Sequence, residues 1–209
     1  MVKSYGKLIV FEGVEGSGKS TQSSILSHKL SSINYDHLLV REPGGTKVGE
    51  KIREIILHED ELTGISELFL LSAARHILIS QTVQPALEIG RLIISDRFFY
   101  SSLAYQGGGR KVDDSLIKFI SKIASANLIP DLIILLDIAP ENSLSRKQKN
   151  NLDRFERENQ FFHNSVRNKY LEIAEQNTEK WFVIDASQKE SDISDQIWDL
   201  ITNKTELLL

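Results

Sequence analysis

The residues best suited to chemistry lie in one glycine-rich segment near the start of the chain. Gly13-Val14-Glu15-Gly16-Ser17-Gly18-Lys19-Ser20 has the spacing G-x-x-x-x-G-K-[ST] and is followed by Thr21. Glycines let the backbone curl until consecutive N–H groups converge on phosphate oxygens, and a lysine at this position can reach the β- and γ-phosphates. A serine hydroxyl there suits Mg²⁺, which prefers oxygen ligands. The segment predicts a nucleotide site with Lys19 as catalytic cation and Ser20 as metal ligand.

The flanks of this segment support the same interpretation. Leu8 to Phe11 is an apolar run typical of a buried strand, and Ile25, Leu26, Leu30 and Ile33 recur at helical spacing after the loop. The glycines therefore lie at a strand-to-helix turn, where the helix adds its partial positive end. The alternative is an ordinary glycine turn with a solvated lysine, and the complete motif between both flanks disfavours it.

Five apolar runs predict the strands of a sheet, and helical patterns separate them. The runs are residues 7–11, 37–40, 91–95, 131–137 and 180–184. This alternation predicts an α/β fold of three layers, with a five-stranded parallel sheet, helices on both faces and a P-loop. The continuous apolar character of 132–136 is what burial on both faces requires. Helices are expected at about 48–56 and 66–88.

Further polar residues follow the predicted strands and should meet the phosphate loop in one cleft. They are the segment Arg41-Glu42-Pro43-Gly44-Gly45, the pair Asp96-Arg97, and Asp137. Ligands of open parallel sheets bind beyond the carboxyl ends of the strands. Arg97 is the candidate cation between an acceptor phosphate and the transferred group, because its planar fork can bind two oxygens, and Asp96 could orient Mg²⁺-bound water. The alternative for this pair is a structural ion pair.

Composition narrows the class of protein. The 209 residues are 41% hydrophobic and 26% charged, and they contain no cysteine. We expect one domain, 1–209, that is soluble, has no membrane segment and is cytoplasmic. The formal charge of -4 argues against a nucleic-acid partner, because such proteins usually carry a basic surface.

Residues 141–158 are rich in basic side chains and are predicted to form a short exposed lid. The basic residues are Arg146, Lys147, Lys149, Arg154 and Arg157. The alternative is a solvated helix face with i,i+4 ion pairs.

A phosphate loop alone does not distinguish a small-molecule kinase from a GTPase switch or a motor ATPase. Asp96-Arg97-Phe98-Phe99 lacks the glycine of a switch motif, and Asn203-Lys204-Thr205-Glu206 does not follow a strand. The chain is also short for a motor with additional domains. A kinase for a small acceptor fits better.

Several ordered motifs then resemble the thymidylate kinase family. They are Arg41-Glu42-Pro43-Gly44-Gly45-Thr46, Asp96-Arg97 with Ser101, Ala104 to Arg110, Pro130 to Glu141, and Leu152-Asp153-Arg154. The resemblance covers nearly the whole chain. It implies transfer of the γ-phosphoryl group of ATP to dTMP, with Mg²⁺, in a homodimer.

The resemblance also implies roles for individual residues. Glu15 would contact the acceptor's 3′-hydroxyl, which gives a reason for a carboxylate beside phosphates. Arg97 and Arg53 would bind the acceptor phosphate, and Arg75 the thymine carbonyl. The complete predicted acceptor site is Glu15, Arg41, Pro43, Arg53, Leu71, Arg75, Arg97, Ser102, Tyr105 and Gln106, with Tyr105 pressing on the sugar C2′.

Two features differ from the family pattern, the residue at position 71 and a lid that is richer in lysine and poorer in arginine than related lids. Leu71 stands where many members have an aromatic residue that stacks on thymine, and such stacking contributes roughly 1–3 kcal/mol in nucleic-acid complexes. Gly16 stands where another subgroup has an arginine, so we expect the lid to supply the catalytic arginine. Arg146 is the first choice, with Lys147, Lys149 and Arg154 as alternatives. A kinase of relaxed pyrimidine specificity and a non-enzymatic nucleotide-dependent switch remain as alternative functions.

Overall fold

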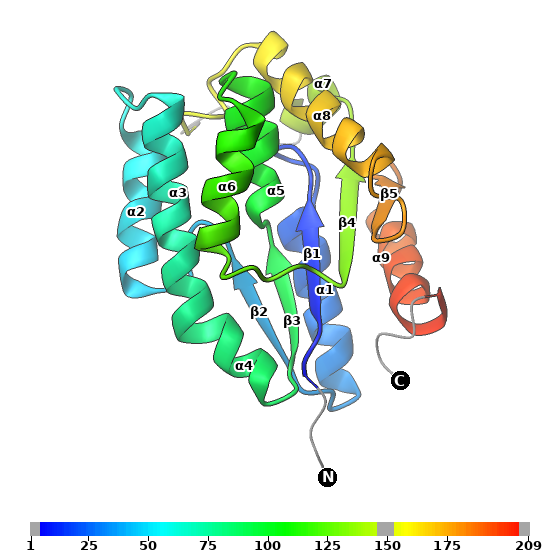
Figure 1. Cartoon of the computed structure of the whole chain (residues 1–209). Helices are drawn as coiled ribbons and strands as arrows, with labels where there is room; N and C mark the ends of the chain where they lie inside the picture. The colour runs from blue at the N-terminus through cyan, green and yellow to red at the C-terminus, as the bar shows by residue number, and fades with distance from the viewer. Residues whose placement is uncertain (1–4, 146–152, 205–209) are drawn as a thin grey trace.

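The computed structural model describes residues 5–145 and 153–204. Five parallel strands form one sheet in the order β2-β3-β1-β4-β5 (Figure 1). The strands are β1 (Leu8–Glu12), β2 (His37–Arg41), β3 (Leu92–Asp96), β4 (Leu132–Asp137) and β5 (Trp181–Asp185). All five predicted strands are thereby confirmed, with ends that differ by at most one residue.

Burial of the strands follows their position in the sheet. Every residue of β1 and β3 is buried, as is β4 up to its last residue, because helices cover both faces of these central strands. The edge strands β2 and β5 contain exposed residues such as Leu39 and Val183. The expectation of burial on both faces is confirmed for the centre of the sheet and wrong for its two edges, where one side of the strand has no neighbour.

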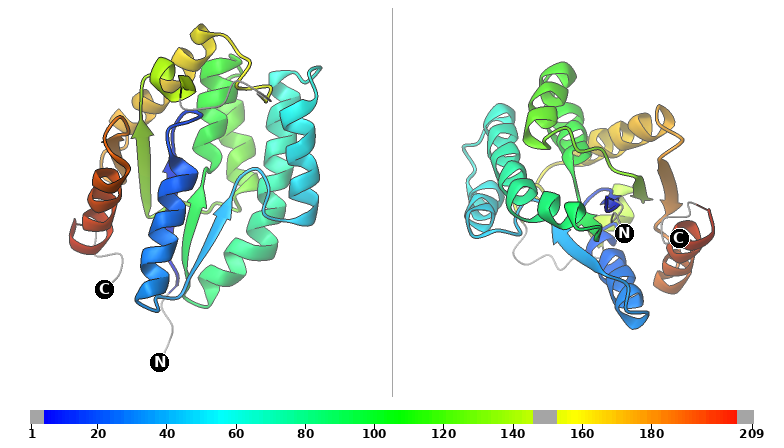
Figure 2. Two further views of the ribbon diagram at one scale, coloured as in Figure 1. Left: turned by 180° about the vertical axis from the view of Figure 1, so that it is seen from behind. Right: turned by 60° about the horizontal axis from the view of Figure 1, so that its bottom comes forward.

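Helices cover both faces of the sheet, as predicted. Figure 2 shows α1 (Lys19–Ser32) and α9 (Glu190–Asp199), which continues into the π-helical turn η3 (Leu200–Lys204), on one face. The other face carries α3 (Gly64–Leu78), α5 (Phe99–Ser102), η2 (Leu103–Gly109), α6 (Asp114–Ala124) and α8 (Gln160–Glu175), with α2 (Lys47–His58) beside α3. No helix in the described part of the chain is both long and apolar enough to span a bilayer.

The long helix expected at 66–88 is present but contains a π-helical turn. It consists of α3, η1 (Ile79–Val83) and α4 (Gln84–Glu88). Pro85 lies in the first turn of α4. Proline has no N–H for the helical ladder and its ring crowds the preceding turn, so a local widening just before it relieves both problems.

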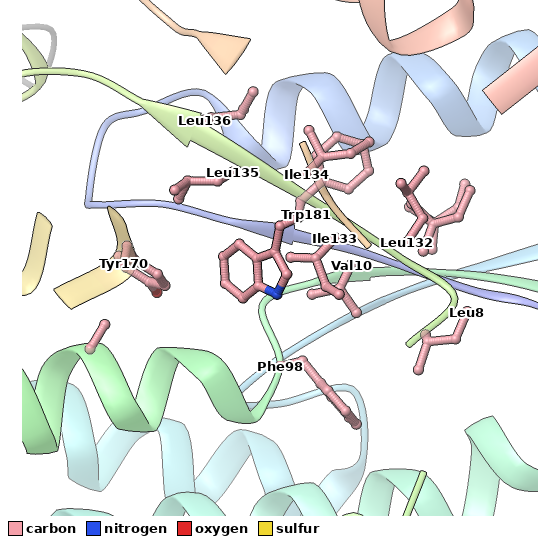
Figure 3. Packing of buried hydrophobic residues seen from close by; sticks show 14 of the residues in the cluster. Leu8, Val10, Phe98, Leu132, Ile133, Ile134, Leu135, Leu136, Tyr170 and Trp181 are labelled. Carbon is pink, nitrogen blue, oxygen red and sulfur yellow. The ribbon is translucent and has the colours of Figure 1, made fainter. Parts of the chain in front are cut away.

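Aromatic residues of α8 and β5 complete the core on one side of the sheet. Figure 3 shows Trp181 beside Val10 and Ile133 of the central strands, with Tyr170 farther toward the Leu135 end of β4. Tyr170 is 1% exposed and Trp181 is 5% exposed. This packing places the Tyr170 hydroxyl next to the end of β1, where it takes part in the site described below.

The segment predicted as an exposed lid differs from that expectation at its end. It begins with α7 (Pro140–Ser145), and residues 146–152, including Arg146, Lys147 and Lys149, lie outside the described residues. Arg154 and Phe155 are only 6% and 7% exposed. Arg154 is buried because its guanidinium donates to Glu67, and Phe155 because its ring packs edge-on against Tyr105. The prediction of an exposed segment was therefore wrong for Arg154 and Phe155, and also for Ser143, which is 1% exposed.

Candidate active site

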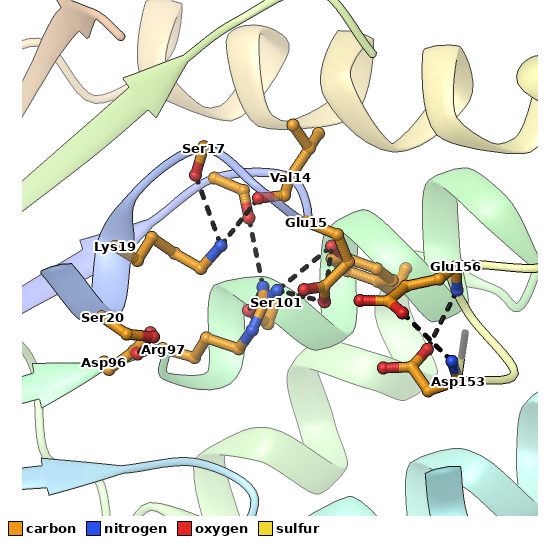
Figure 4. A network of polar contacts seen from close by, with 12 residues as sticks. Val14, Glu15, Ser17, Lys19, Ser20, Asp96, Arg97, Ser101, Asp153 and Glu156 are labelled. Atoms are coloured by element: carbon orange, nitrogen blue, oxygen red, sulfur yellow. Dashed lines mark hydrogen bonds and ion pairs between the residues drawn. The ribbon is translucent and has the colours of Figure 1, made fainter. Parts of the chain in front are cut away.

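The phosphate loop joins β1 to α1, as the sequence predicts. Gly16 and Gly18 have φ angles of 72° and 95°, which favour glycine, and α1 begins at Lys19. The Lys19 ammonium donates to the Val14 carbonyl at 2.7 Å and to Ser17 Oγ at 3.4 Å (Figure 4). The lysine thus lies over the loop that a nucleotide's phosphates would occupy.

Burial changes the acid–base behaviour of this lysine. It lowers the pKa of Lys19 to about 8, and the Arg97 guanidinium adds to the effect. The carboxylates of Glu15 and Asp96 act in the opposite direction. A bound polyphosphate would also favour the charged ammonium, so ligand binding and protonation at Lys19 are linked.

Two oxygen side chains meet beside the loop. Ser20, on the first turn of α1, donates its hydroxyl to Asp96 Oδ2 at 2.5 Å. Asp96 ends β3, and its register opposite Phe11 brings it to the loop. A hydroxyl and a carboxylate are donors that Mg²⁺ accepts, and this ion usually keeps few protein ligands beside water and substrate phosphates. The described residues contain no group of three or more His, Cys, Asp or Glu side chains arranged to hold a metal.

Arg97 stands at the centre of the site. Its φ of 75° is unusual for a residue with a side chain, and such conformations cost on the order of 1–3 kcal/mol and cluster at functional sites. One guanidinium nitrogen donates to the Gly13 carbonyl at 3.1 Å, and the other forms an ion pair with Glu15. Burial alone would lower the pKa of Arg97, but the Glu15 carboxylate raises it well above its ordinary value. The Arg97 guanidinium therefore keeps its positive charge.

Glu12 is a fully buried acidic residue that the sequence analysis did not identify, and it is linked to Arg97 through two hydroxyl groups. Glu12 accepts the hydroxyls of Ser101 at 2.7 Å and Tyr170 at 2.8 Å, and backbone N–H groups of Phe98 and Ser101. Both hydroxyls lie within reach of Arg97 Nη1, at 3.1 and 3.4 Å. Burial raises the pKa of Glu12. The signal available in the sequence was an acidic residue closing an otherwise apolar strand.

One cavity of about 600 Å³ joins the phosphate loop to the ends of β2, β3 and helix α3. All ten predicted acceptor residues line it: Glu15, Arg41, Pro43, Arg53, Leu71, Arg75, Arg97, Ser102, Tyr105 and Gln106. Of the predicted ATP-binding residues, it is lined by Glu15, Gly16, Ser17, Gly18, Lys19, Ser20 and Thr21, whereas Gly13 and Val14 contribute the carbonyls already described. Residues that are far apart in the sequence, from Glu15 to Ile193, thus share one space.

The far end of the cavity holds a buried ion pair. Arg75 Nε donates to Glu42 Oε2 at 2.6 Å, and its terminal nitrogens lie 3.4 and 3.5 Å from Ser102 Oγ. Arg75 is 2% exposed, so the carboxylate compensates a charge that burial would otherwise disfavour. Burial in turn raises the pKa of Glu42 to about 7, against the lowering effect of Arg75. Sequence reasoning identified Arg75 but missed Glu42 as its partner.

Other positions complete the walls. The Tyr105 hydroxyl lies 3.3 Å from Arg97 Nη2 and 3.4 Å from Glu15 Oε1. Arg53 donates to the Pro43 carbonyl at 3.0 Å, and the exposed Arg41 pairs with Glu50. The cavity is also lined by residues that were not predicted, among them Phe155 and, from the β5–α9 region, Gln188, Glu190 and Ile193.

Not every residue expected in the cleft lies there. Asp137 is absent from the cavity lining, because Arg167 of α8 binds both of its oxygens, at 2.7 and 2.8 Å. This prediction was wrong: the carboxylate at the end of β4 fixes a helix to the sheet. Gly44 and Gly45 also lie off the lining, and Arg154, an alternative lid cation, is held by Glu67.

Comparison with known proteins gives a consistent result. The family model described as thymidylate kinase matches residues 11–197. A thymidylate kinase of Pelotomaculum thermopropionicum is 45% identical over 88% of each chain, and one of Caldanaerobacter subterraneus subsp. tengcongensis is 40% identical over 88% of this chain and 89% of its own. The crystal structure of thymidylate kinase from Ehrlichia chaffeensis superposes with a TM-score of 0.80 at 28% identity, over 94% of this chain and 99% of that one. The predicted three-layer P-loop fold is confirmed, and the chain belongs to the thymidylate kinase family.

Proposed function

We propose that this chain transfers the γ-phosphoryl group of ATP to dTMP, giving ADP and dTDP for dTTP synthesis. The observation that carries the proposal is the single cavity in which a phosphate loop faces Arg97 and, beyond it, the buried Arg75–Glu42 pair. Membership of the family favours this reaction over a kinase of relaxed pyrimidine specificity and over a nucleotide-dependent switch.

The phosphoryl transfer needs positioning and charge neutralisation more than covalent help. An oxygen of the dTMP phosphate forms a bond to the γ-phosphorus, the bond from that phosphorus to the β–γ bridging oxygen breaks, and its electron pair leaves with ADP. Lys19 would neutralise the β- and γ-oxygens from the loop side. Arg97, with Arg53, would bind the acceptor phosphate and reduce its repulsion from ATP. Arg41 and Pro43 would border that phosphate.

Magnesium is proposed as the cofactor. Ser20 would be its direct protein ligand, and Asp96, which accepts the Ser20 hydroxyl, would bind through coordinated water. When bound, the ion would supply positive charge that neutralises phosphate oxygens of the nucleotide. Both side chains are oxygen donors, so the site suits a hard cation.

The acceptor's nucleoside would lie between Tyr105 and the far end of the cavity. Glu15 would accept the 3′-hydroxyl, and the Tyr105 ring would leave no room for a hydroxyl at C2′. Arg75 would donate to a thymine carbonyl, with Ser102 and Gln106 at the other base edge and Leu71 against its face. Leu71 is half-buried and lines the cavity, as does Phe155, whose ring packs edge-on against Tyr105.

The chain as a whole is proposed to act as one domain, 1–209, in the cytoplasm and as a homodimer. Exposed apolar side chains on the neighbouring helices α3 and α6 suit a dimer interface. They are Ile65, Phe69, Leu116, Phe119 and Ile123, with exposed fractions of 38%, 57%, 37%, 63% and 60%. Leu78 is excluded from such an interface, because it is 1% exposed and belongs to the core.

Coupled ADP release tests the reaction. We expect rapid ADP release from ATP and Mg²⁺ only when dTMP is added, with much slower release for dUMP, dCMP and dGMP. Lys19→Met should abolish it without changing the melting temperature of the free protein by more than a few degrees. Comparable rates with several pyrimidines would contradict narrow specificity, and ATP hydrolysis that ignores every monophosphate would contradict the kinase.

The lid arginine is tested by a matched pair of variants. Arg146→Ala should lower kcat by about 10³-fold with dTMP affinity nearly unchanged, because an arginine finger acts on transition-state charge. Lys147→Ala is the control and should keep most of the rate. A full rate in Arg146→Ala would exclude it as the finger.

A further inference from the structure

Glu67 is a fully buried carboxylate that does not itself line the active-site cavity but contacts a residue that does. Its exposed fraction is 0%, and its Oε2 accepts the side-chain N–H of Gln106 at 2.7 Å. Its Oε1 accepts from Arg110 at 2.9 Å and from Arg154 at 2.6 Å. Side-chain N–H groups of Gln106, Arg110 and Arg154 donate all three contacts, and the two Glu67 oxygens accept them.

The position of Glu67 relates it directly to the far end of the cavity. Glu67, Leu71 and Arg75 follow one another at four-residue intervals along α3, and therefore share one face of that helix. Ser102 and Gln106 lie along the facing segment of α5 and η2. Two cross-connections join the helices, Arg75 to Ser102 at one end and Glu67 to Gln106 at the other, and Leu71 lies between them along α3.

The contact with Glu67 fixes which end of the Gln106 amide is available to a ligand. The side-chain nitrogen of Gln106 must face Glu67, because the Glu67 oxygen accepts a hydrogen bond and the carbonyl oxygen of the amide cannot donate one. That oxygen, Oε1, is buried and has no hydrogen-bond partner among the described residues. A buried acceptor without a partner is costly, so it favours a ligand that brings an N–H group.

We propose that Glu67 is a specificity-determining positioning residue, which orients the Gln106 amide so that its carbonyl oxygen accepts a ring N–H of the acceptor base. This inference rests on the proposed function, since it assigns that base to the cavity between α3 and η2. Arg75 then presents donors and Gln106 an acceptor. Thymine matches this pair, because a carbonyl oxygen stands beside its ring N–H. Cytosine presents the reverse, an amino group beside a ring nitrogen that accepts.

Glu67→Gln tests the orientation with a change of similar size. A glutamine at position 67 can donate as well as accept, so the Gln106 amide is free to take either orientation. We expect the ratio of kcat/KM for dTMP to that for dCMP to fall about tenfold or more, because discrimination depends on leaving a buried polar group unpaired with the wrong base. Most of the change should come from a higher kcat/KM for dCMP, and kcat/KM for dTMP should change less.

A swap of the two side chains provides the rescue. In Glu67→Gln with Gln106→Glu, the new amide donates to the new carboxylate, whose second oxygen again accepts from the base. The dTMP to dCMP ratio should return to within about threefold of the native value. Arg110→Gln is the control for structural damage, because it removes one ion pair of Glu67 without touching Gln106. It should lower the melting temperature and leave the ratio unchanged.

Each outcome bears on the inference. An unchanged ratio in Glu67→Gln, with a loss of stability like that of Arg110→Gln, would reduce Glu67 to a structural role and overturn the proposal, as would a swap that fails to restore the ratio. If Glu67→Gln does not fold, Gln106→Met takes its place, and a native ratio there would likewise overturn it. Failure of the proposed function is a different result: the native protein would not phosphorylate dTMP.

Discussion

At the scale of single residues, the site depends on charges that burial makes sensitive to their neighbours. Lys19 is the clearest case, because burial lowers its pKa to about 8 from an ordinary 10.5. Above that pH the free protein loses the Lys19 proton, whereas bound phosphates restore it. Between about pH 8 and pH 10, ATP binding should therefore take up as much as one proton, and ATP affinity should fall by as much as about tenfold per pH unit.

Calorimetry measures this proton uptake. ATP binding at pH 9 is titrated in two buffers of different ionisation enthalpy, and the difference between the observed heats gives the number of protons taken up. Uptake should be negligible at pH 7, where Lys19 is already charged. Lys19→Met should show none at either pH, and equal uptake in that variant would assign the proton to another group.

The buried Arg75–Glu42 pair predicts a stability effect at the same scale. Glu42→Ala leaves a guanidinium that is 2% exposed without its carboxylate, so the free energy of unfolding should fall by about 3–5 kcal/mol. Arg75→Met with Glu42→Ala should cost less than the sum of the single variants, because neither charge is then left alone. Urea unfolding measures the cycle.

An exposed ion pair provides the comparison. Arg91 pairs with Asp36, whose side chain is 71% exposed, and Asp36→Ala should cost about 1 kcal/mol or less. A cost for Glu42→Ala as small as that for Asp36→Ala would mean that the buried pair contributes little to the folded state.

At the scale of elements, helix α7 closes against the phosphate loop. A Cβ at Gly16 would lie 2.4 Å from the Ser143 carbonyl oxygen of α7, whereas a Cβ at Gly18 would meet nothing within 4 Å. Both glycines have positive φ, so alanine is strained at either position. Gly16→Ala should therefore lower the melting temperature of the nucleotide-free protein by several degrees more than Gly18→Ala, because only the former displaces α7. Differential scanning calorimetry measures the melting temperatures of both variants. Equal shifts would mean that α7 can move away from residue 16 without loss of stability.

Elements also show which structural features the sequence could predict. The five strands are recognisable because each is a short apolar run between helical patterns, and their common direction brings Arg41, Asp96 and the phosphate loop together. The π-helical turn η1 is not predictable from apolar spacing, since periodicity does not distinguish it from the α-helix around it. Asp137 shows the converse: its position at a strand end predicted a ligand contact, but Arg167, thirty residues later, occupies it.

The site was predictable where a residue's chemistry has one obvious use. The sequence identified three cations, Lys19, Arg97 and Arg75. A cation that is buried or clustered with others requires a partner or a ligand, and this requirement points to a functional site. Their carboxylate supports, Glu12 and Glu42, could not be identified, because a pairing between residues far apart in the chain depends on tertiary packing. The same reason applies to Arg154, whose burial depends on Glu67.

At the scale of the whole molecule, the exposed apolar residues of α3 and α6 call for a partner, and the proposed homodimer provides one. Phe119 is the largest of them on α6 and is 63% exposed. Phe119→Glu would place a charge in the interface, where desolvation without a partner is costly. We expect sedimentation equilibrium to show a dimer for the native protein and a monomer for Phe119→Glu. The melting temperature of the variant should fall only by the stabilisation that the partner subunit adds.

The control for that experiment is an apolar residue of similar exposure on another helix. Ile33, at the end of α1 on the opposite face of the sheet, is 54% exposed. Ile33→Glu should remain dimeric, because solvent reaches that position in either state. If both variants dissociate, the effect is one of net charge and not of the α6 surface. If Phe119→Glu stays dimeric, the interface lies elsewhere, and the exposed side chains of α3 and α6 serve another contact.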